Sequence, residues 1–236
     1  MAACPLVEAT EVRKLAELED DHWWYRERRH LLARELRGLR PGRALDVGAA
    51  GGGNTRVLRR LGWDAVALEY GPDGAEVARE RGLATVRGDA MALPVADGSL
   101  DLVVAFDVLE HLQDDDAAVR EVHRALRPGG HFLVAVPCDP RLWSAHDEAV
   151  GHVRRYTRPT LTSLLVRGGF ALGPMRSWMV LLRPVVALRR RASSGSDLDE
   201  LSPLVNNGLR AVITAERYLP VRSLPGVSLL VAARRP

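Results

Sequence analysis

The stretch RALDVGAAGGG, residues 43–53, decides the fold. Its first five residues are mostly apolar and predict a buried strand, whereas its last six are all glycine or alanine. A helix is predicted directly afterwards, over residues 54–61. Small residues between a strand and a helix let the backbone approach a ligand, and the helix N-terminus offers free N–H groups. The stretch therefore predicts the ligand-binding turn of an α/β sheet.

Strands and helices continue to alternate after this turn. The sequence predicts strands over 64–69, 83–87, 100–106 and 131–136, and helices over 73–81 and 114–126. Such spacing is typical of a doubly wound parallel sheet with a Rossmann-like α/β fold. Further on, we expect a helix from Thr157 or Pro159 to Gly168, a strand over 170–177 and a final strand over 227–233.

Two helices are predicted before the turn. The first covers residues 8–19, where apolar side chains recur at helical spacing. The second follows Asp21, a favourable N-cap, and ends near Leu36. It carries the aromatic cluster HWWY, residues 22–25. Such a cluster indicates a helix packed on the sheet, a cation–π wall for a positively charged ligand, or both.

Composition excludes several classes of protein. The chain has 236 residues, of which 47% are apolar and 27% charged, as in ordinary soluble globular proteins. Cys4 and Cys138 are its only cysteines, which excludes a disulfide scaffold and favours a reducing, cytoplasmic location. We find no uninterrupted apolar run of spanning length and expect neither a spanning helix nor a signal peptide.

The charges are distributed unevenly. Residues 1–150 hold 19 basic and 26 acidic side chains, whereas residues 151–236 hold 14 and 4. Lys14 is the only lysine, which excludes a phosphate loop of the Gly-Lys-Ser/Thr type and a Tyr-x-x-x-Lys pair. The basic C-terminal third lacks interleaved stacking residues, so a nucleic-acid partner is disfavoured.

Acidic residues follow the predicted strands where a ligand would lie. Asp46 stands two residues before the first glycine, where it would repel a pyrophosphate but suit a ligand with an amino group and a sulfonium. Glu69 ends the next strand, where a carboxylate can accept both ribose hydroxyls of an adenosine. Asp89 could accept the adenine amine or simply form a turn. Asp46 favours S-adenosylmethionine over NAD.

These motifs together resemble the class I S-adenosylmethionine-dependent methyltransferases. The resemblance rests on LDVGAAGG, residues 45–52, and on DVLEHL, residues 107–112, and it covers about residues 43–136. It implies a seven-stranded, mostly parallel sheet whose last strand is antiparallel, with helices on both faces. One position departs from the family pattern: Ala50 replaces the second loop glycine, and we expect an alanine there to be tolerable if its φ stays negative.

The resemblance also implies which residues bind the cofactor, S-adenosylmethionine. Those that line its methionine part are Asp46, Gly48, Ala50 and Gly52. Those further along are Glu69 at the ribose, Asp89 and Ala90 at the adenine, and Phe106 and Asp107 at the methionine end. The helix that carries Trp24 and Tyr25 resembles one that closes over the cofactor.

We predict three parts of the chain. Residues 1–42 form a helical lid, residues 43–177 with 227–236 form the methyltransferase core, and residues 178–226 form a helical cap inserted into it. The cap is mostly apolar, with arginine residues at intervals along it. It could cover a hydrophobic acceptor, lie on an anionic membrane surface, or simply expose its arginines to solvent. The oligomeric state does not follow from the sequence.

Methyl transfer from a sulfonium needs alignment and sometimes a base. An oxygen acceptor must lose its proton, and the candidate bases are His111, His146 and His152. Structural roles stay open for His111 and His152. A metal site formed by His146, Asp147, Glu148 and His152 is disfavoured, because the two histidines are six residues apart and do not share a helix face. We therefore predict no metal.

The predicted function is methyl transfer to a small or lipophilic acceptor, with oxygen slightly favoured over nitrogen, in secondary metabolism or envelope glycolipid synthesis. An NAD-dependent oxidoreductase is the first alternative, and Asp46 counts against it. A non-catalytic protein that binds the cofactor or a membrane is the second.

Overall fold

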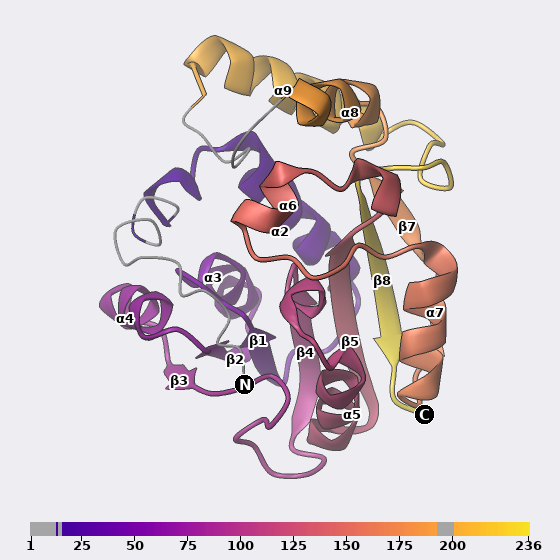
Figure 1. Cartoon of the computed structure of the whole chain (residues 1–236). Helices are drawn as coiled ribbons and strands as arrows, with labels where there is room; N and C mark the ends of the chain where they lie inside the picture. Colours follow the sequence, from indigo (N-terminus) through magenta and orange to yellow (C-terminus); the bar gives the residue numbers. More distant parts are fainter. Residues whose placement is uncertain (1–12, 14–15, 193–200) are drawn as a thin grey trace.

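The computed structural model describes residue 13, residues 16–192 and residues 201–236. A mixed sheet in the order β3-β2-β1-β4-β5-β8-β6 forms its centre, and β7 also pairs with β8 (Figure 1). The strands are β1 (Arg43–Val47), β2 (Asp64–Glu69), β3 (Thr85–Arg87), β4 (Leu100–Phe106), β5 (Leu126–Pro137), β6 (Ala171–Leu172), β7 (Arg176–Trp178) and β8 (Ser228–Arg234). The first five run parallel, and β8 lies antiparallel to β5, which confirms the predicted fold class.

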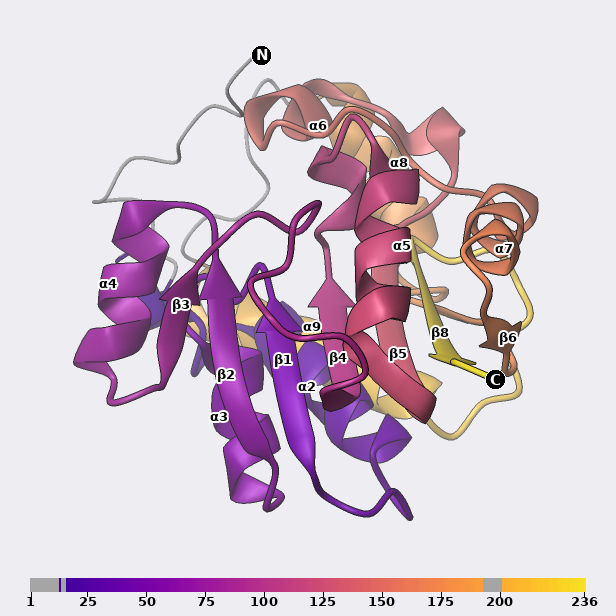
Figure 2. The same ribbon diagram turned by 90° about the horizontal axis from the view of Figure 1, so that it is seen from below.

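Helices cover both faces of this sheet. They are α2 (Trp23–Glu35), α3 (Gly53–Arg60), α4 (Pro72–Glu80), α5 (Asp115–Ala125), α6 (Ala145–Ala149), α7 (Arg158–Arg167), α8 (Arg183–Ala192) and α9 (Pro203–Glu216), with two 3-10 turns, η1 (Leu109–His111) and η2 (Pro140–Leu142). The helices α5 and α7 lie on one face of the sheet, and α2, α3 and α9 lie on the other (Figure 2). Their apolar side chains pack into two separate clusters.

The alternation of side chains along each strand produces these two cores. In β4, Val103 packs with the α5 side, whereas Leu102 and Val104 pack with the α2 side. All of these side chains are fully buried. A strand buried on both faces must be apolar throughout, which is why the short apolar runs in the sequence identify the strands.

The site is positioned by β1, which lies between β2 and β4. Because these strands are parallel, the residues that follow them meet at one edge of the sheet. This edge gathers the glycine loop, Glu69 and Asp107. Ligands bind at such a switch point in open α/β sheets. The helices α8 and α9 lie above the same edge (Figure 1).

Three local predictions need correction. The N-cap of α2 is His22, not Asp21, because the His22 Nδ1 accepts the N–H of Trp24 at 3.4 Å. The strand predicted over 131–136 begins earlier, at Leu126, with a register shift opposite β4. The strand predicted over 170–177 is two short strands, since the intervening Pro174 has no N–H to donate to β8.

Parts of two other predictions lie outside the described residues. Of the helix predicted over 8–19, Arg13 and residues 16–19 are described: Arg13 and residues 16–18 are helical, and Glu19 lies in a turn. Of the cap predicted over residues 178–226, residues 193–200 also lie outside the described residues. No helix in the described part of the chain combines the length and the apolar character that a bilayer crossing requires.

Candidate functional site

The loop after β1 needs its glycines for two reasons. Gly48 and Gly52 have φ of +65° and +83°, in the left-handed region that favours glycine. A Cβ on Gly48 would lie only 2.6 Å from Val108 Cγ2, and one on Gly52 would clash with Leu83. The loop therefore packs directly against the segment that follows β4, and any larger residue would push the two apart.

The backbone of Ala50 differs from the expectation that its φ would be negative. Its φ is +45°, not negative. A non-glycine residue in this region has a conformational free energy about 1–2 kcal/mol higher, because its Cβ approaches the following carbonyl oxygen. The N–H of Ala50 donates to Glu69 Oε2 at 2.7 Å, which holds the loop in this conformation. The alanine is thus accommodated with backbone strain.

We expect Ala50→Gly to stabilise the protein by about 0.5–1 kcal/mol, because relief of the strained φ exceeds the added entropy of the unfolded chain. Urea unfolding of both proteins would measure the difference. Ala49→Gly is the matched control: Ala49 has no positive φ, so it should lose stability. A loss of stability in Ala50→Gly as large as in the control would contradict the strained loop.

Asp46 presents an unsatisfied carboxylate oxygen beside the loop. Its side chain is buried, with 1% of its surface exposed, and Thr55 Oγ1 donates to Oδ2 at 2.6 Å. Oδ1 has no hydrogen-bond partner among the described residues. Burial raises the pKa of Asp46 to about 7. A buried acceptor without a donor fits the positively charged amino group of the cofactor's methionine part.

Glu69 is held in place by three backbone N–H groups. Ala50 donates to one carboxylate oxygen, and Tyr70 and Gly71 donate to the other at 3.0 and 3.2 Å. This arrangement fixes the carboxylate at the end of β2, where the ribose prediction places it. Asp89 Oδ1 accepts the N–H of Met91 at 2.8 Å, so the turn-forming role is present there. Ala90 is partly buried beside the core.

Arg28, which the sequence analysis missed, joins α2 to the end of β4. Its guanidinium donates to the carbonyl of Phe106, and its Nε lies 2.9 Å from Asp107 Oδ2. It also stands 5.0 Å from the ring centre of Trp24. Burial raises the pKa of Asp107 despite Arg28. The one signal in the sequence is the spacing: Arg28 follows Trp24 by four residues, on the same helix face.

Trp24 and Tyr25, which the sequence predicts at the cofactor, both pack against other aromatic rings. Trp24 stacks on Trp178 with ring centres 6.1 Å apart, and Tyr25 meets Trp24 edge-on at 4.8 Å. Burial raises the pKa of Tyr25 to about 12. Phe106 is fully buried beneath α2, so its ring belongs to the core. The helix-packing interpretation therefore holds for this aromatic cluster.

A cavity of about 260 Å³ lies beside this helix. All three candidate bases line it, together with Trp24 and Asp107. Much of the remaining wall is apolar and comes from α2, α8, α9 and their neighbours: Trp23, Pro137, Val150, Met179, Leu182, Val185, Val186, Leu201, Leu209 and Val227. The polar residues His22, Arg155, Arg189, Arg190 and Ser228 complete the lining. A largely apolar chamber with some polar groups is typical of a small-molecule site.

Two histidines of this cavity, His111 and His152, are fixed through their Nδ1 atoms. His152 Nδ1 lies 2.7 Å from Asp147 Oδ1, which also accepts from Arg155 Nε at 2.8 Å. His111 Nδ1 lies 3.3 Å from the carbonyl of Gly151. Burial, with a smaller effect of His152, lowers the pKa of His111 to about 4, so it is neutral at neutral pH. Both rings therefore have a structural anchor and a second nitrogen, Nε2.

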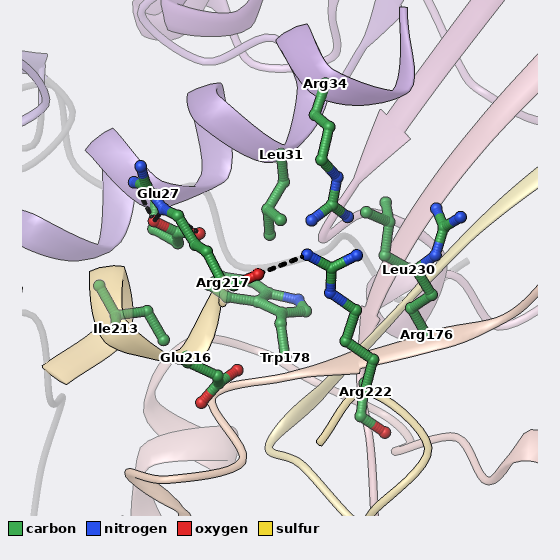
Figure 3. A pocket seen from close by; sticks show the side chains of 11 residues that line it. Glu27, Leu31, Arg34, Arg176, Trp178, Ile213, Glu216, Arg217, Arg222 and Leu230 are labelled. Carbon is green, nitrogen blue, oxygen red and sulfur yellow. Dashed lines mark hydrogen bonds and ion pairs between the residues drawn. The ribbon is translucent and has the colours of Figure 1, made fainter. Parts of the chain in front are cut away.

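A second cavity lies between α2 and the segment around β7 and α9 (Figure 3). Arg34 and Arg222 point toward each other there, near the buried ring of Trp178 (Figure 3). The Arg217–Glu27 ion pair fastens α9 to α2 at the same place. This second cavity has a volume of about 20 Å³, which holds one water molecule, so the cavity is too small for an acceptor.

Cys138 has a structural role. Its side chain is buried, and its thiol donates to the carbonyl of Gly226 at 3.2 Å. Burial raises the pKa of the thiol to about 11, which keeps it protonated and unreactive.

Comparison with known proteins agrees with this geometry. A family model described as a methyltransferase domain matches residues 45–134. A Mycolicibacterium smegmatis protein named "Probable S-adenosylmethionine-dependent methyltransferase" is 32% identical over 72% of this chain and 66% of its own length. A ubiquinone biosynthesis O-methyltransferase of Xanthomonas oryzae is 36% identical over 39% of this chain and 42% of its own length. The chain thus spans about two thirds of the first relative and less than half of the second.

A solved structure shares the fold over nearly the whole chain. It is a complex of a methyltransferase with a Haloferax volcanii methyltransferase activator, with a TM-score of 0.66 and 22% identity. The likeness covers 97% of this chain and 94% of that one.

The sheet, the glycine loop and the acids at its edge define a Rossmann-like protein that binds a nucleoside cofactor. The chain belongs to the class I S-adenosylmethionine-dependent methyltransferases. The family, the enzyme class and the cofactor predicted from the sequence are thereby confirmed.

Proposed function

We propose that this protein transfers the methyl group of S-adenosylmethionine to an oxygen atom of a small, lipophilic acceptor. The observation that carries the proposal is the cavity of about 260 Å³, whose wall is largely apolar and which is also lined by four histidines and Asp107. Asp107 adjoins Val108, against which the glycine loop packs. The acceptor chamber and the predicted methionine subsite are therefore neighbours, as methyl transfer requires.

Partial similarity to an O-methyltransferase of ubiquinone biosynthesis supports oxygen as the methylated atom. The residues of the cavity support it too, since a hydroxyl must lose a proton and His152 can accept one. In its neutral form, His152 keeps its proton on Nδ1, next to Asp147, and presents a lone pair at Nε2. The buried Asp147 carboxylate would stabilise the imidazolium that forms.

Atoms and electrons balance in this transfer. The cofactor, when bound, supplies a methyl group activated by a sulfonium. The acceptor's O–H proton passes to His152 Nε2, and its oxygen forms the new O–CH3 bond. Sulfur keeps the electron pair of the S–CH3 bond that breaks. The chain contributes alignment and exclusion of water, because residues of α2, α8 and α9 line the cavity.

The predicted division of the chain belongs to the same proposal. Residues 1–42 and 178–226 would cover the core and admit the acceptor. The cap exposes Leu188 and Leu204 at 70% and 84% of their surfaces, which supports peripheral contact with a membrane that holds a lipophilic acceptor. A cytoplasmic location and a role in secondary metabolism or envelope glycolipid synthesis stay predictions.

The test is methyl transfer from labelled cofactor to a panel of small phenols, quinols and matched amines. We expect labelled ethers from apolar phenols. We also expect His152→Asn to lower kcat about 100-fold or more, as loss of a general base does, with cofactor affinity unchanged. His131→Asn is the control, because His131 lies in β5, outside the cavity lining. Labelled amines without labelled ethers would contradict the proposal, as would a fully active His152→Asn.

A further inference from the structure

Three metal-ligand side chains converge in the cavity. Among the described residues, the ligand atoms of Glu110, His111 and His152 all lie within 4.8 Å of one another. His152 Nε2 is 3.8 Å from Glu110 Oε1. The first two residues belong to η1, directly after β4, and the third precedes α7. The sheet edge therefore brings together ligands that are about forty residues apart in the chain.

Both histidines are already oriented as metal ligands are. Metal-binding histidines almost always donate the N–H of the other ring nitrogen to a carboxylate or a backbone carbonyl. Here His152 Nδ1 faces the Asp147 carboxylate and His111 Nδ1 faces the Gly151 carbonyl. Carbonyl and carboxylate oxygens accept only, so each Nδ1 carries the proton in the neutral ring. Each Nε2 is left with a lone pair.

Unlike the two histidines, whose Nδ1 atoms have partners, the Glu110 carboxylate has no hydrogen-bond donor among the described residues. It is fully buried, and neither carboxylate oxygen has a hydrogen-bond partner in the part of the chain that the structure describes. A buried carboxylate is costly unless it is paired or coordinates a cation. A cation placed between Glu110 and the two Nε2 atoms would satisfy all three side chains.

We propose that Glu110, His111 and His152 bind one divalent transition-metal ion, with Zn²⁺ as the best-suited probe. Two imidazoles and one glutamate are a ligand set of catalytic zinc sites, which keep a fourth position open. Imidazole ligands disfavour Mg²⁺ and Ca²⁺. Tetrahedral zinc places its ligand atoms about 3.3 Å apart, so the three side chains would draw together by about 1 Å on binding.

This inference rests on the proposed function and deepens it. Because His111 and His152 line the cavity, the open position of the metal would face the acceptor. A hydroxyl bound there loses its proton to solvent more readily, and its oxygen stays on the metal until the O–CH3 bond forms. With metal bound, His152 Nε2 is a ligand and no longer accepts the proton. The Zn²⁺ ion would instead lower the pKa of the acceptor hydroxyl, and the proton would pass to a water molecule.

The experiment is calorimetric titration of the chelator-treated full chain with ZnCl2 alone, and separately with MgCl2. We expect one high-affinity Zn²⁺ per chain and no comparable Mg²⁺ binding. His111→Ala, His152→Ala and Glu110→Gln should each weaken Zn²⁺ binding at least about 100-fold. His146→Ala is the matched control, because His146 lines the same cavity but lies outside the ligand set, and it should bind Zn²⁺ normally.

Co²⁺ gives a second readout that does not depend on turnover. Its visible absorption should show coordination by nitrogen and oxygen ligands in the unmodified chain and lose intensity in His152→Ala. Zn²⁺ binding that survives in all three ligand variants would overturn the site, as would full methyl transfer by a chain that binds no Zn²⁺. Zn²⁺ binding with no transfer to any oxygen would support the metal site and overturn the proposed acceptor.

Discussion

Asp46→Asn is expected to weaken S-adenosylmethionine binding by about 100-fold or more while stabilising the free protein at alkaline pH. The substitution keeps the shape of the side chain and a carbonyl oxygen that can accept from Thr55. It removes the negative charge that the unpaired Oδ1 offers to the cofactor's amino group. Calorimetric titration with S-adenosylmethionine and S-adenosylhomocysteine would measure the first effect.

The pH dependence follows from the raised pKa of Asp46. Its folded-state value is about 7, against 3.8 for the ordinary group, so the folded state binds the proton more tightly than the unfolded state. Stability is therefore greatest below about pH 4 and falls as the pH rises toward 7. A difference of about three pH units corresponds to roughly 4 kcal/mol for this fully buried group. The amide of the Asp46→Asn variant does not ionise, so this decline should disappear.

Urea unfolding at about pH 5 and about pH 8 would measure the second effect. The stability gained by Asp46→Asn should be about 2–3 kcal/mol larger at the higher pH, because part of the decline has already occurred at pH 5. Asp64→Asn is the control, because Asp64 is exposed at the opposite end of β2 and should change neither property. Unchanged cofactor affinity in Asp46→Asn would rule out the assigned role of this carboxylate.

Asp147→Ala is expected to destabilise the protein by about 3–5 kcal/mol, the usual loss when one partner of a buried ion pair is removed. The Asp147 side chain is fully buried. It accepts from Arg155 and holds His152, and its Oδ2 accepts the N–H of Ser144 at 3.0 Å. Without it, the buried Arg155 guanidinium would lose its carboxylate partner. The free energy of unfolding in urea measures the loss.

Glu148→Ala provides the comparison for this prediction. Glu148 is the next residue in α6 but is exposed, so its loss should change stability by less than about 0.5 kcal/mol. We also expect Asp147→Ala to lower kcat, because His152 loses the partner that fixes its ring. An Asp147→Ala protein as stable as Glu148→Ala would show that Arg155 finds another partner or that the pair is not buried in solution.

Much of the sheet followed from the sequence alone. The bounds of β1, β2 and β4 agree with the predicted strands, because a strand buried on both faces must be a short, nearly continuous apolar run. The sequence also located the glycine loop at the end of β1 and the two acids beside it, Asp46 and Glu69, whose roles at the cofactor stay predictions. The outer strand predicted over 170–177 was less accurate, because pairing with β8 rather than local pattern decides where β6 and β7 lie.

The conformation of the loop could be decided only by the tertiary structure. Whether Ala50 has a positive φ depends on its hydrogen bond to Glu69, which lies on the neighbouring strand. The ion pair of Arg28 with Asp107 likewise joins α2 to β4. Neither contact leaves a strong local pattern, because its partners are far apart in the chain.

The sequence by itself determined the fold class, the family and the cofactor, since these depend on short motifs with their own local physics. The tertiary structure decided that His111, His146 and His152 share one cavity, that Asp147 holds His152, and that Glu110 is buried without a donor among the described residues. These contacts form between segments that follow different parallel strands and lie together at one edge of the sheet. Such contacts depend on the packing of the whole sheet, so no single stretch of sequence contains them.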